Sequence, residues 1–434
     1  MKKMDKSAPI LYRLSSVIVD RNRAYDEITF HQAARVIADT IGTIYSGIKT
    51  EAFQRALINK NILFGIGDFS IIGTDITTSL GGAVFYNTLA ISLTDFDEGH
   101  RKAVGHPASM IVPVAIIFGE YLKVSKTDIL RSVIIGYEIA TRFSNARVKE
   151  SITTYSSGRW GAIGTAATAS YLLGLSIEQT MHALSNAAIL SPVMLGGSTD
   201  VSTGSMSKEG AAWAAQSGLQ STLLSKEEFV GPYLFVDDHD DYDKDILLEG
   251  IGESWLINSN YFKPYACCRW LHSAIAAVME IKKDHDLNIE EITTIEVNIF
   301  KRAIDLISNN YPQNPIQAQF HLPYCIAIGI LFNEVTPKNF IEANLNNSKV
   351  LSLIDKTIIK KDDDYNILFP ERLPSRVIIS TVNSEHFSKE VISAPWDADN
   401  HPSDELLFKK LINQAGDAGT RFWKDYLKWN SKSA

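Results

Sequence analysis

The sequence predicts a mainly α fold, with a large all-helical domain and a smaller α+β lid domain. Through residues 1–250 apolar side chains recur mostly at helical spacing, and residues 28–48 are a clear example. Residues 292–300, 376–382 and 387–393 instead alternate between apolar and polar side chains, which is typical of half-buried strands. Because helical segments lie between and around these strands, the second half of the chain favours an α+β domain.

In the first half we expect helices at residues 28–48, 53–63, 107–122, 125–143, 160–173, 176–190 and 207–224. Ser125, Ser176 and Ser207 are candidate N-caps, because a serine hydroxyl accepts a hydrogen bond from a free N–H of the first turn. Residues 65–93 are rich in small side chains, which let helix backbones approach closely, so we expect a tightly packed helix pair there. No strand is expected in residues 1–250.

In the second half we expect further helices at residues 271–285, 317–333 and 337–343. His401 to Glu405 then open a final amphipathic helix, in which Leu406, Leu407, Leu411 and Ile412 lie on one side. That helix is predicted to return to the first domain.

Composition excludes several classes of protein. The chain has 434 residues, of which 45% are hydrophobic and 21% charged, as in an ordinary globular protein. The net charge is −8 without a long basic run, so we expect no nucleic-acid partner. The longest apolar stretch, residues 110–118, is too short to cross a membrane. The N-terminus lacks the apolar region of a secretory signal and the three cysteines cannot form a paired disulfide framework, so we expect a cytoplasmic protein.

The most unusual stretch is polar and lies between apolar, helix-prone segments. Residues 94–101 read Thr-Asp-Phe-Asp-Glu-Gly-His-Arg and are continued by Gly105, His106 and Pro107. Burying so many charges is costly unless they are paired with one another. The stretch is therefore either a solvent-exposed loop between helices or a site with paired charges.

Two further clusters favour anion binding. Residues 155–161 place glycines and hydroxyls before a predicted helix, whose free N–H groups attract an anion, although an ordinary helix entry explains them equally well. Residues 203–210 place Lys208 at a predicted helix start, where a cation is unfavourable unless an anion accompanies it. The alternative there is a surface lysine.

The last cluster, residues 263–272, lies where the sequence changes from helical to mixed character. Its Lys263, Arg269 and His272 suit binding of a polycarboxylate and proton transfer, unless the segment is a loop whose charges face solvent. Cys267 and Cys268 are adjacent, which is poor spacing for a shared metal, and we interpret them as packing residues.

Taken together and in this order, these clusters resemble the MmgE/PrpD family, which includes 2-methylcitrate dehydratase, cis-aconitate decarboxylase and iminodisuccinate epimerase. The resemblance spans nearly the whole chain and rests on residues 95–98 with 105–107, 136–140, 160–167, Lys208 with 213–218, 263–265 with Cys268, Arg269 and His272, and 318–320 with 322–324.

The resemblance implies a discontinuous helical domain of residues 1–262 and 402–434, with a lid domain of residues 263–401 inserted in it. It further implies an active site in the cleft between them, a homodimer, and no metal or organic cofactor. Asp95, His106, Lys208 and Lys263 match the positions of the family's active-site Asp, His and two Lys. The chain departs from the decarboxylase pattern in having Gly99 and His100 after the acidic run and Tyr155 where a histidine is expected.

The chemistry shared by the family is proton transfer at a carbon beside a carboxylate, whose enediolate needs nearby positive charge. Lys208, Lys263 and Arg269 are candidates to bind carboxylates, and a lysine with a lowered pKa could serve as the base. We expect His106 or Tyr155 to donate a proton, and Asp95 to orient His106. The residues expected to bind substrate are His100, Arg101, Ser157, Arg269, His272 and Tyr324.

We therefore expect a cofactor-independent hydro-lyase of the 2-methylcitrate dehydratase type, acting on a small di- or tricarboxylate. The alternatives are an epimerase of an iminodisuccinate-like acid, a cis-aconitate-type decarboxylase, and a non-catalytic binding protein with the same fold. The same residues serve elimination or epimerisation, and geometry decides between them.

Overall fold

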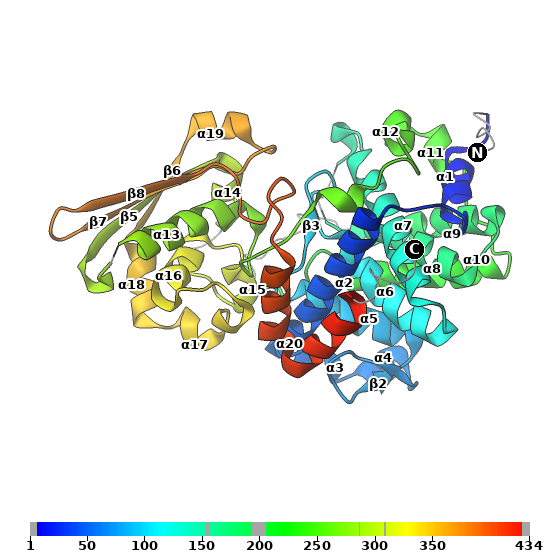
Figure 1. Ribbon diagram of the computed structural model, residues 1–434, viewed down its shortest axis with the longest axis horizontal. Coiled ribbons are helices and arrows are strands. Elements are labelled where there is room, and N and C mark those ends of the chain that lie inside the picture. The colour runs from blue at the N-terminus through cyan, green and yellow to red at the C-terminus, as the bar shows by residue number, and fades with distance from the viewer. Residues whose placement is uncertain (1–6, 153–155, 193–204, 286, 308–309, 428–434) are drawn as a thin grey trace.

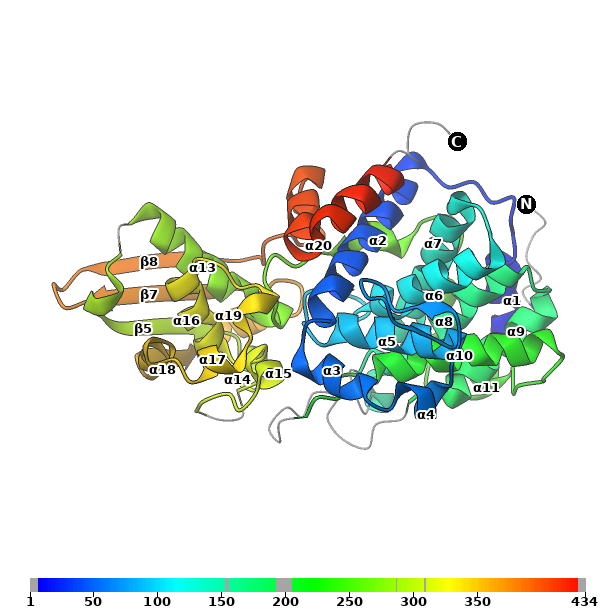
Figure 2. The same cartoon turned by 90° about the horizontal axis from the view of Figure 1, so that it is seen from below.

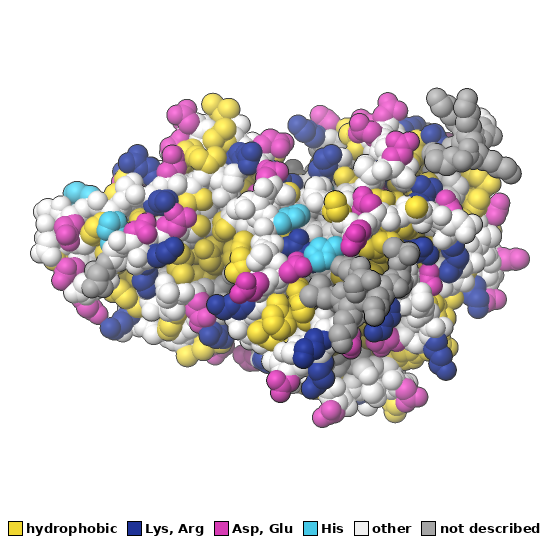
Figure 3. Space-filling model, viewed as in Figure 1, with side chains coloured by type: hydrophobic (Ala, Val, Ile, Leu, Met, Phe, Trp, Pro, Cys, Tyr) yellow, Lys and Arg dark blue, Asp and Glu magenta, His cyan; other side chains and the backbone are white. Residues whose placement is uncertain are grey.

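Helices form most of the structure, a computed structural model that describes residues 7–152, 156–192, 205–285, 287–307 and 310–427 (Figure 1). Two hydrophobic cores lie within it, a larger one built mainly by helices and a smaller one that joins helices to a sheet. The predicted fold class, mainly α with an α+β part, is confirmed. Figure 3 shows acidic and basic side chains interspersed on one face, without a broad basic surface.

The larger, helical unit draws its elements from both ends of the described chain. Its helices are α1 (Ile10–Ile18), α2 (Glu27–Gly47), α3 (Glu51–Leu57), α4 (Lys60–Phe64), α5 (Leu80–Ser92), α6 (Pro107–Leu122), α7 (Lys126–Asn145), α8 (Gly158–Leu173), α9 (Ile177–Leu190), α10 (Ala211–Lys226), α11 (Phe235–Asp238), α12 (Lys244–Leu248) and α20 (Asp404–Leu427), with 3-10 turns η1 (Lys149–Ser151) and η2 (Leu256–Ser259). None of the helices in the described part of the chain combines the length and the apolar character needed to cross a bilayer.

Local sequence signals explain several of these helices. The Ser125 hydroxyl accepts a hydrogen bond from the N–H of Asp128, and Ser176 forms a capping box with Gln179. Helices α7 and α8 approach closely because small residues face each other: a Cβ atom added to Gly164 would lie 2.7 Å from the carbonyl oxygen of Gly136. Small residues thus allow close packing between α7 and α8.

The structure contradicts the expected helix pair at 65–93, the expected helix start at Ser207 and the expected absence of strands in the first half. Residues 65–93 form one helix, α5, preceded by a hairpin of β1 (Phe69–Ser70) and β2 (Thr77–Thr78), because Gly73 at φ 80° turns the chain back. Helix α10 begins at Ala211 rather than at Ser207, because Gly210 at φ 63° and Glu209 at φ 57° interrupt helical geometry. A further short pair, β3 (Gly99–His100) with β4 (Asn260–Tyr261), also contradicts the strand-free expectation.

The smaller unit is a four-stranded mixed sheet covered by helices. Strands β5 (Ile292–Ile299), β6 (Thr357–Lys361), β7 (Ser375–Thr381) and β8 (His386–Val391) lie in the order β6-β5-β7-β8, with only the β5–β6 pair parallel. Its other elements are α13 (His272–Asp284), α14 (Lys301–Ile304), α15 (Pro315–Ala318), α16 (Leu322–Phe332), α17 (Glu342–Leu345), α18 (Ser348–Asp355), α19 (Asp363–Leu368) and turns η3 (Arg269–Leu271), η4 (Ile289–Glu291) and η5 (Pro337–Asn339).

The smaller unit differs from expectation in its helices and its edge. The predicted helix at 317–333 is interrupted at His321, whose side chain caps α16, and the predicted helix at 337–343 is a 3-10 turn followed by α17. Strand β6 was not expected. It lies at the edge of the sheet and is largely exposed, so it lacks a buried apolar face.

The chain crosses between the two units twice. The outgoing crossing follows β4 and the return precedes α20, and they are joined by a hydrogen bond of 2.9 Å from the N–H of Phe262 to the carbonyl of Trp396. Helix α20 then lies beside α2 in both views, with Leu407 and Leu411 in the larger core (Figures 1 and 2). The predicted domain boundaries fall at these crossings, and the division itself stays a prediction.

Candidate active site

The acidic stretch is a buried loop between α5 and α6. Asp95, Asp97 and Glu98 are each at most 2% exposed. Asp95 has φ 47°, a conformation that few residues other than glycine adopt, and this turns the loop inward after α5. At its other end, Pro107 occupies the first turn of α6, which is a favoured position for proline. The loop is thus not the solvent-exposed connection that was its alternative interpretation.

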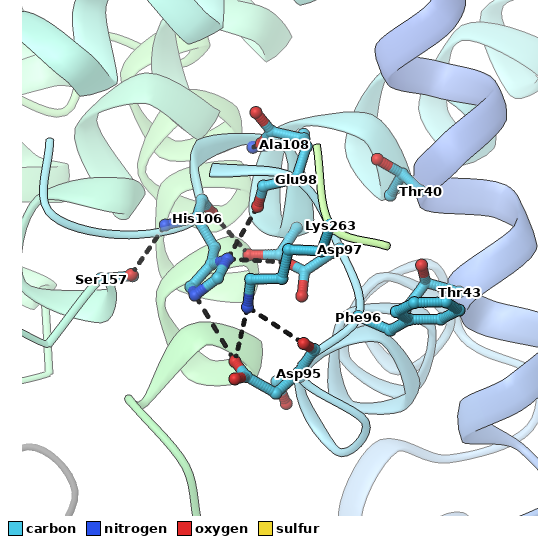
Figure 4. A network of polar contacts seen from close by, with 12 residues as sticks. Thr40, Thr43, Asp95, Phe96, Asp97, Glu98, His106, Ala108, Ser157 and Lys263 are labelled. Carbon is cyan, nitrogen blue, oxygen red and sulfur yellow. Dashed lines mark hydrogen bonds and ion pairs between the residues drawn. The ribbon is translucent and has the colours of Figure 1, made fainter. Parts of the chain in front are cut away.

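Asp95 is surrounded by three cationic side chains, of which the two lysines come from distant parts of the chain. Its Oδ1 lies 2.5 Å from Nζ of Lys208, 3.0 Å from Nζ of Lys263 and 3.6 Å from Nε2 of His106. Lys263 also donates a hydrogen bond of 3.0 Å to the Asp95 carbonyl (Figure 4). The structure therefore brings together the four residues that the sequence assigned to one site.

These contacts fix the charge of the cluster. Burial alone raises the pKa of Asp95, but Lys208 and Lys263 outweigh it and the pKa of this carboxyl is lowered. Burial alone lowers the pKa of Lys263, but Asp95 outweighs it and the pKa is raised. The expectation that a clustered lysine has a lowered pKa is therefore wrong for Lys263, because a carboxylate lies against it.

His106 is held as an imidazolium. Its Nδ1 lies 2.7 Å from the carbonyl oxygen of Glu98, which only accepts, so Nδ1 carries a proton. Asp97 Oδ2 lies 3.3 Å from the same nitrogen. Burial lowers the pKa of His106, but Asp97 outweighs it and raises the pKa to about 9. The orientation of this ring is set by the Glu98 carbonyl, whereas Asp95 faces the other nitrogen, Nε2, which has a proton to give.

The Glu98 carboxylate stabilises the loop through three hydrogen bonds. Its Oε1 accepts a hydrogen bond of 3.0 Å from the N–H of Ala108, and its Oε2 accepts one of 2.6 Å from the Tyr137 hydroxyl. Asn260 donates to the same Oε2 at 3.3 Å. Burial raises the pKa of Glu98 to about 7. These bonds connect the loop to α6, α7 and β4.

A small cavity opens beside the cluster, with about 200 Å³ of free space including its solvent mouth. Its lining residues are Ser92, Asp97, His106, Ser109, Lys208, Glu209 and Ala211. Asp95 Oδ2 is buried and accepts no hydrogen bond from the described residues. The opening thus presents an acid, His106, and a cation, Lys208, which suits proton transfer to a bound anion.

Ser157 lies at the N-terminus of α8, where the sequence predicted an anion, and the anion there is Glu209. The Ser157 hydroxyl donates a hydrogen bond of 2.5 Å to Oε2 of Glu209 and accepts one of 3.1 Å from the N–H of His106. Ser157 therefore connects α8 to the active-site loop. Tyr155, the other candidate in this cluster, lies outside the described residues.

Two predicted substrate-binding arginines are engaged in ion pairs. Arg101 contacts Asp397 at 2.8 Å and Asp399 at 2.9 Å. Arg269 contacts the other oxygen of Asp397 at 2.5 Å and lies 4.3 Å over the ring of Tyr261. Asp397 thus joins an arginine of the helical unit to one at the start of the smaller unit, close to the crossings.

The remaining predicted residues are buried and hydrogen-bonded away from Asp95. His100 contacts the Ser259 hydroxyl at 3.0 Å, and Tyr324 donates to the Asn339 carbonyl at 2.9 Å. His272 donates from Nε2 to the Cys267 carbonyl at 3.1 Å, while its Nδ1 is buried and has no hydrogen-bond partner among the described residues. Burial lowers the pKa of His100 and of His272 to about 3, so both are neutral. Their part in substrate binding stays a prediction.

The sequence interpretation missed the contributions of Asp97, Glu209, Asp39 and Lys410. Asp97 raises the pKa of His106, and Glu209 accepts a hydrogen bond from Ser157. Both lie within segments that were recognised, next to residues that were chosen. Asp39 and Lys410 form hydrogen bonds with the backbone of the loop at Glu98 and Phe96. They lie inside long helices, where the only signal is a charged residue at a position on the apolar face.

No group of three or more His, Cys, Asp or Glu side chains suited to a metal ion occurs within the described ranges. At Asp95 the carboxylate is already surrounded by cations, which oppose a further positive charge. The expectation that the protein uses no metal or organic cofactor stays a prediction.

Comparison with known proteins gives two matches to family models. Residues 17–244 match the MmgE/PrpD N-terminal domain, and residues 265–421 match the MmgE/PrpD C-terminal domain. Cis-aconitate decarboxylase of Homo sapiens is 25% identical over 367 residues, which cover 78% of this chain and 75% of that protein. The enzyme of Mus musculus is 23% identical over 355 residues, covering 77% and 72%. That of Aspergillus terreus is 21% identical over 381 residues, covering 80% and 77%.

Proposed function

Because this chain belongs to the MmgE/PrpD family, we propose that it is a lyase that acts on a small di- or tricarboxylate through a carbanion beside a carboxylate. The observation that carries the proposal is the buried imidazolium of His106 next to Lys208 and Lys263, with a cavity at its side. A carbanion beside a carboxylate is an enediolate, and fixed cations in a buried site stabilise it strongly.

Within this class we propose decarboxylation as the reaction. The bond between carbon and one substrate carboxylate breaks, CO2 leaves, and the electron pair remains on carbon, delocalised toward another carboxylate. Nε2 of His106 donates its proton to a carbon of that anion, and water returns a proton to the ring. This step needs an acid and cations but no base. The similarity to proteins named cis-aconitate decarboxylase supports the same reaction.

Dehydration needs a base as well as an acid, and four groups of the site are poorly suited to the role of base. His106 and Lys263 have raised pKa values and hold their protons at neutral pH. Asp95 and Asp97 have lowered pKa values, which makes them weak bases. The hydro-lyase of the 2-methylcitrate type is therefore the second candidate. The departures from the decarboxylase pattern at Gly99, His100 and Tyr155 count against decarboxylation and keep both the hydro-lyase and the epimerase open.

Product analysis separates these reactions. The purified protein is incubated in heavy water with cis-aconitate, 2-methylcitrate and an aspartate-derived diacid, and products are followed by proton NMR together with CO2 release. Decarboxylation releases CO2 and adds one solvent deuterium to the product. An alkene formed without CO2 supports the hydro-lyase, and exchange of C–H for deuterium without net reaction supports an epimerase. Binding without any of these, detected as a thermal shift, supports a non-catalytic binding protein.

We also propose the division into a body of residues 1–262 and 402–434 and a lid of residues 263–401, and assembly as a homodimer, on the strength of the family resemblance. Sedimentation equilibrium tests the dimer directly. Dialysis against a chelator tests the expectation that no metal is needed, with unchanged activity as the predicted result.

A further inference from the structure

We infer that Lys410 and Asp39, a buried ion pair between α20 and α2, act as positioning residues for the active-site loop. The inference rests on the proposed function, because it concerns how the loop presents Asp95 and His106. Neither side chain lines the cavity. Both act through the backbone of residues 96–98.

Lys410 binds the backbone of the loop at Phe96. Its Nζ lies 2.6 Å from Oδ1 of Asp39 and donates a second hydrogen bond of 2.6 Å to the Phe96 carbonyl. The same ammonium lies 4.0 Å from the centre of the Phe96 ring, so it also makes a cation–π contact. Phe96 in turn packs into the core of the smaller unit. One loop residue is thus held by the C-terminal helix and by the second core.

Asp39 binds the backbone of the loop two residues further on, at Glu98. Its Oδ2 accepts a hydrogen bond of 3.0 Å from the N–H of Glu98. The pair therefore holds the Phe96 carbonyl and the Glu98 N–H, the backbone groups on either side of Asp97. Since the Glu98 carbonyl accepts the Nδ1 proton of His106, the same contacts set where the imidazole points.

The composition of this pair argues for a positioning role. Burying a lysine and an aspartate carries a large desolvation cost, and well-packed apolar side chains often serve stability equally well. Here the two charges are only 4% and 0% exposed, yet their remaining hydrogen bonds go to the backbone of a loop with a strained Asp95. A displacement of about 1 Å in such a loop is enough to lower turnover about 100-fold.

Two variants test the inference. Lys410→Met removes the ammonium and leaves Asp39 without its ion-pair partner, whereas Asp39→Asn combined with Lys410→Met removes both charges. The matched control is Glu138→Gln combined with Arg142→Met. That pair is equally buried, has an Oε1–Nε distance of 2.6 Å, and forms no hydrogen bond with residues 95–106. Steady-state kinetics, melting temperature and the NMR signal of the His106 Nδ1 proton are measured for each.

The expected result is a fall in kcat of at least about tenfold in both Lys410 variants, with KM changed by less than about threefold. The His106 proton signal moves in these variants, whereas the control loses melting temperature but keeps kcat and that signal. An unmoved signal, or equal losses of kcat in the control, would overturn the inference. So would a double variant that fails to fold while the control pair folds. Because the signal is recorded without substrate, it decides the inference even if the wild type proves inactive on every polycarboxylate.

Discussion

Lys208 and Asp95 lie 113 residues apart in the chain, yet Nζ of the one is 2.5 Å from Oδ1 of the other in a buried ion pair. Lys263 shares the same oxygen. A carboxylate of the protein therefore occupies the position between two lysines where a substrate carboxylate would find its best partners. Both lysines are thus paired with Asp95.

Replacing Lys208 by Met removes one of these cations while Lys263 still pairs Asp95, so the fold is expected to persist. Loss of a fixed charge that stabilises an enediolate should lower kcat by about 10²–10³-fold. Lys226→Met, at the exposed C-terminal end of helix α10, is the control and should keep full activity. Activity within a factor of about 2 of the wild type would remove Lys208 from the mechanism.

Replacing His106 by Gln removes the proton donor. We expect kcat to fall by about 10²–10⁴-fold, while the exposed His285→Gln variant keeps its activity. Since His106 must be protonated and its pKa is about 9, wild-type activity should decline as the pH rises through that value. A pH profile that is flat up to pH about 10 would show that another group donates the proton.

The same imidazole should make stability depend on pH. The folded pKa of about 9 lies above the ordinary value of 6.5, so the folded state binds the proton more tightly. This stabilisation is fully present below pH about 6.5 and is lost as the pH rises through 9. At about 1.4 kcal/mol per pKa unit it is on the order of 3 kcal/mol. Urea unfolding of the wild type and His106→Gln at several pH values measures it, and parallel curves would contradict it.

Asp397 and Asp399 both contact Arg101, but only Asp397 is buried: their side chains are 3% and 58% exposed. Asp397→Asn leaves Arg101 and Arg269 short of a buried partner and should cost about 3–5 kcal/mol of unfolding free energy. Asp399→Asn should cost less than about 1 kcal/mol. Equal losses for the two variants in denaturant titrations would refute the account of Asp397 as the link between the two units.

Much of the helical body could be predicted because its signals are local. The caps at Ser125 and Ser176 and the apolar periodicity of α2 depend on neighbouring residues only. Residues 65–79 were misassigned because small residues suit a close helix pair and a turn equally well, and Gly73 selects the turn. Strand β6 was missed because an exposed edge strand has no buried face to reveal it.

The site could be predicted in its principal residues and not in its supports. Asp95, His106, Lys208 and Lys263 are unusual in apolar surroundings and match a family pattern. The side chains that raise the pKa of His106 or hold the loop in place were not predicted. The loop, for example, is held by a contact between distant segments, that of Lys410 with the Phe96 carbonyl, 314 residues away. Sequence spacing carries no record of such contacts.

The most direct test of the account is a single-turnover reaction with cis-aconitate in heavy water, comparing the wild type with His106→Gln. The account predicts that the wild type releases CO2 and places one deuterium on the product carbon, and that the variant binds the acid but does neither. Equal deuterium incorporation by the two proteins, or no carbon–carbon cleavage by a folded wild type that binds the acid, would contradict it.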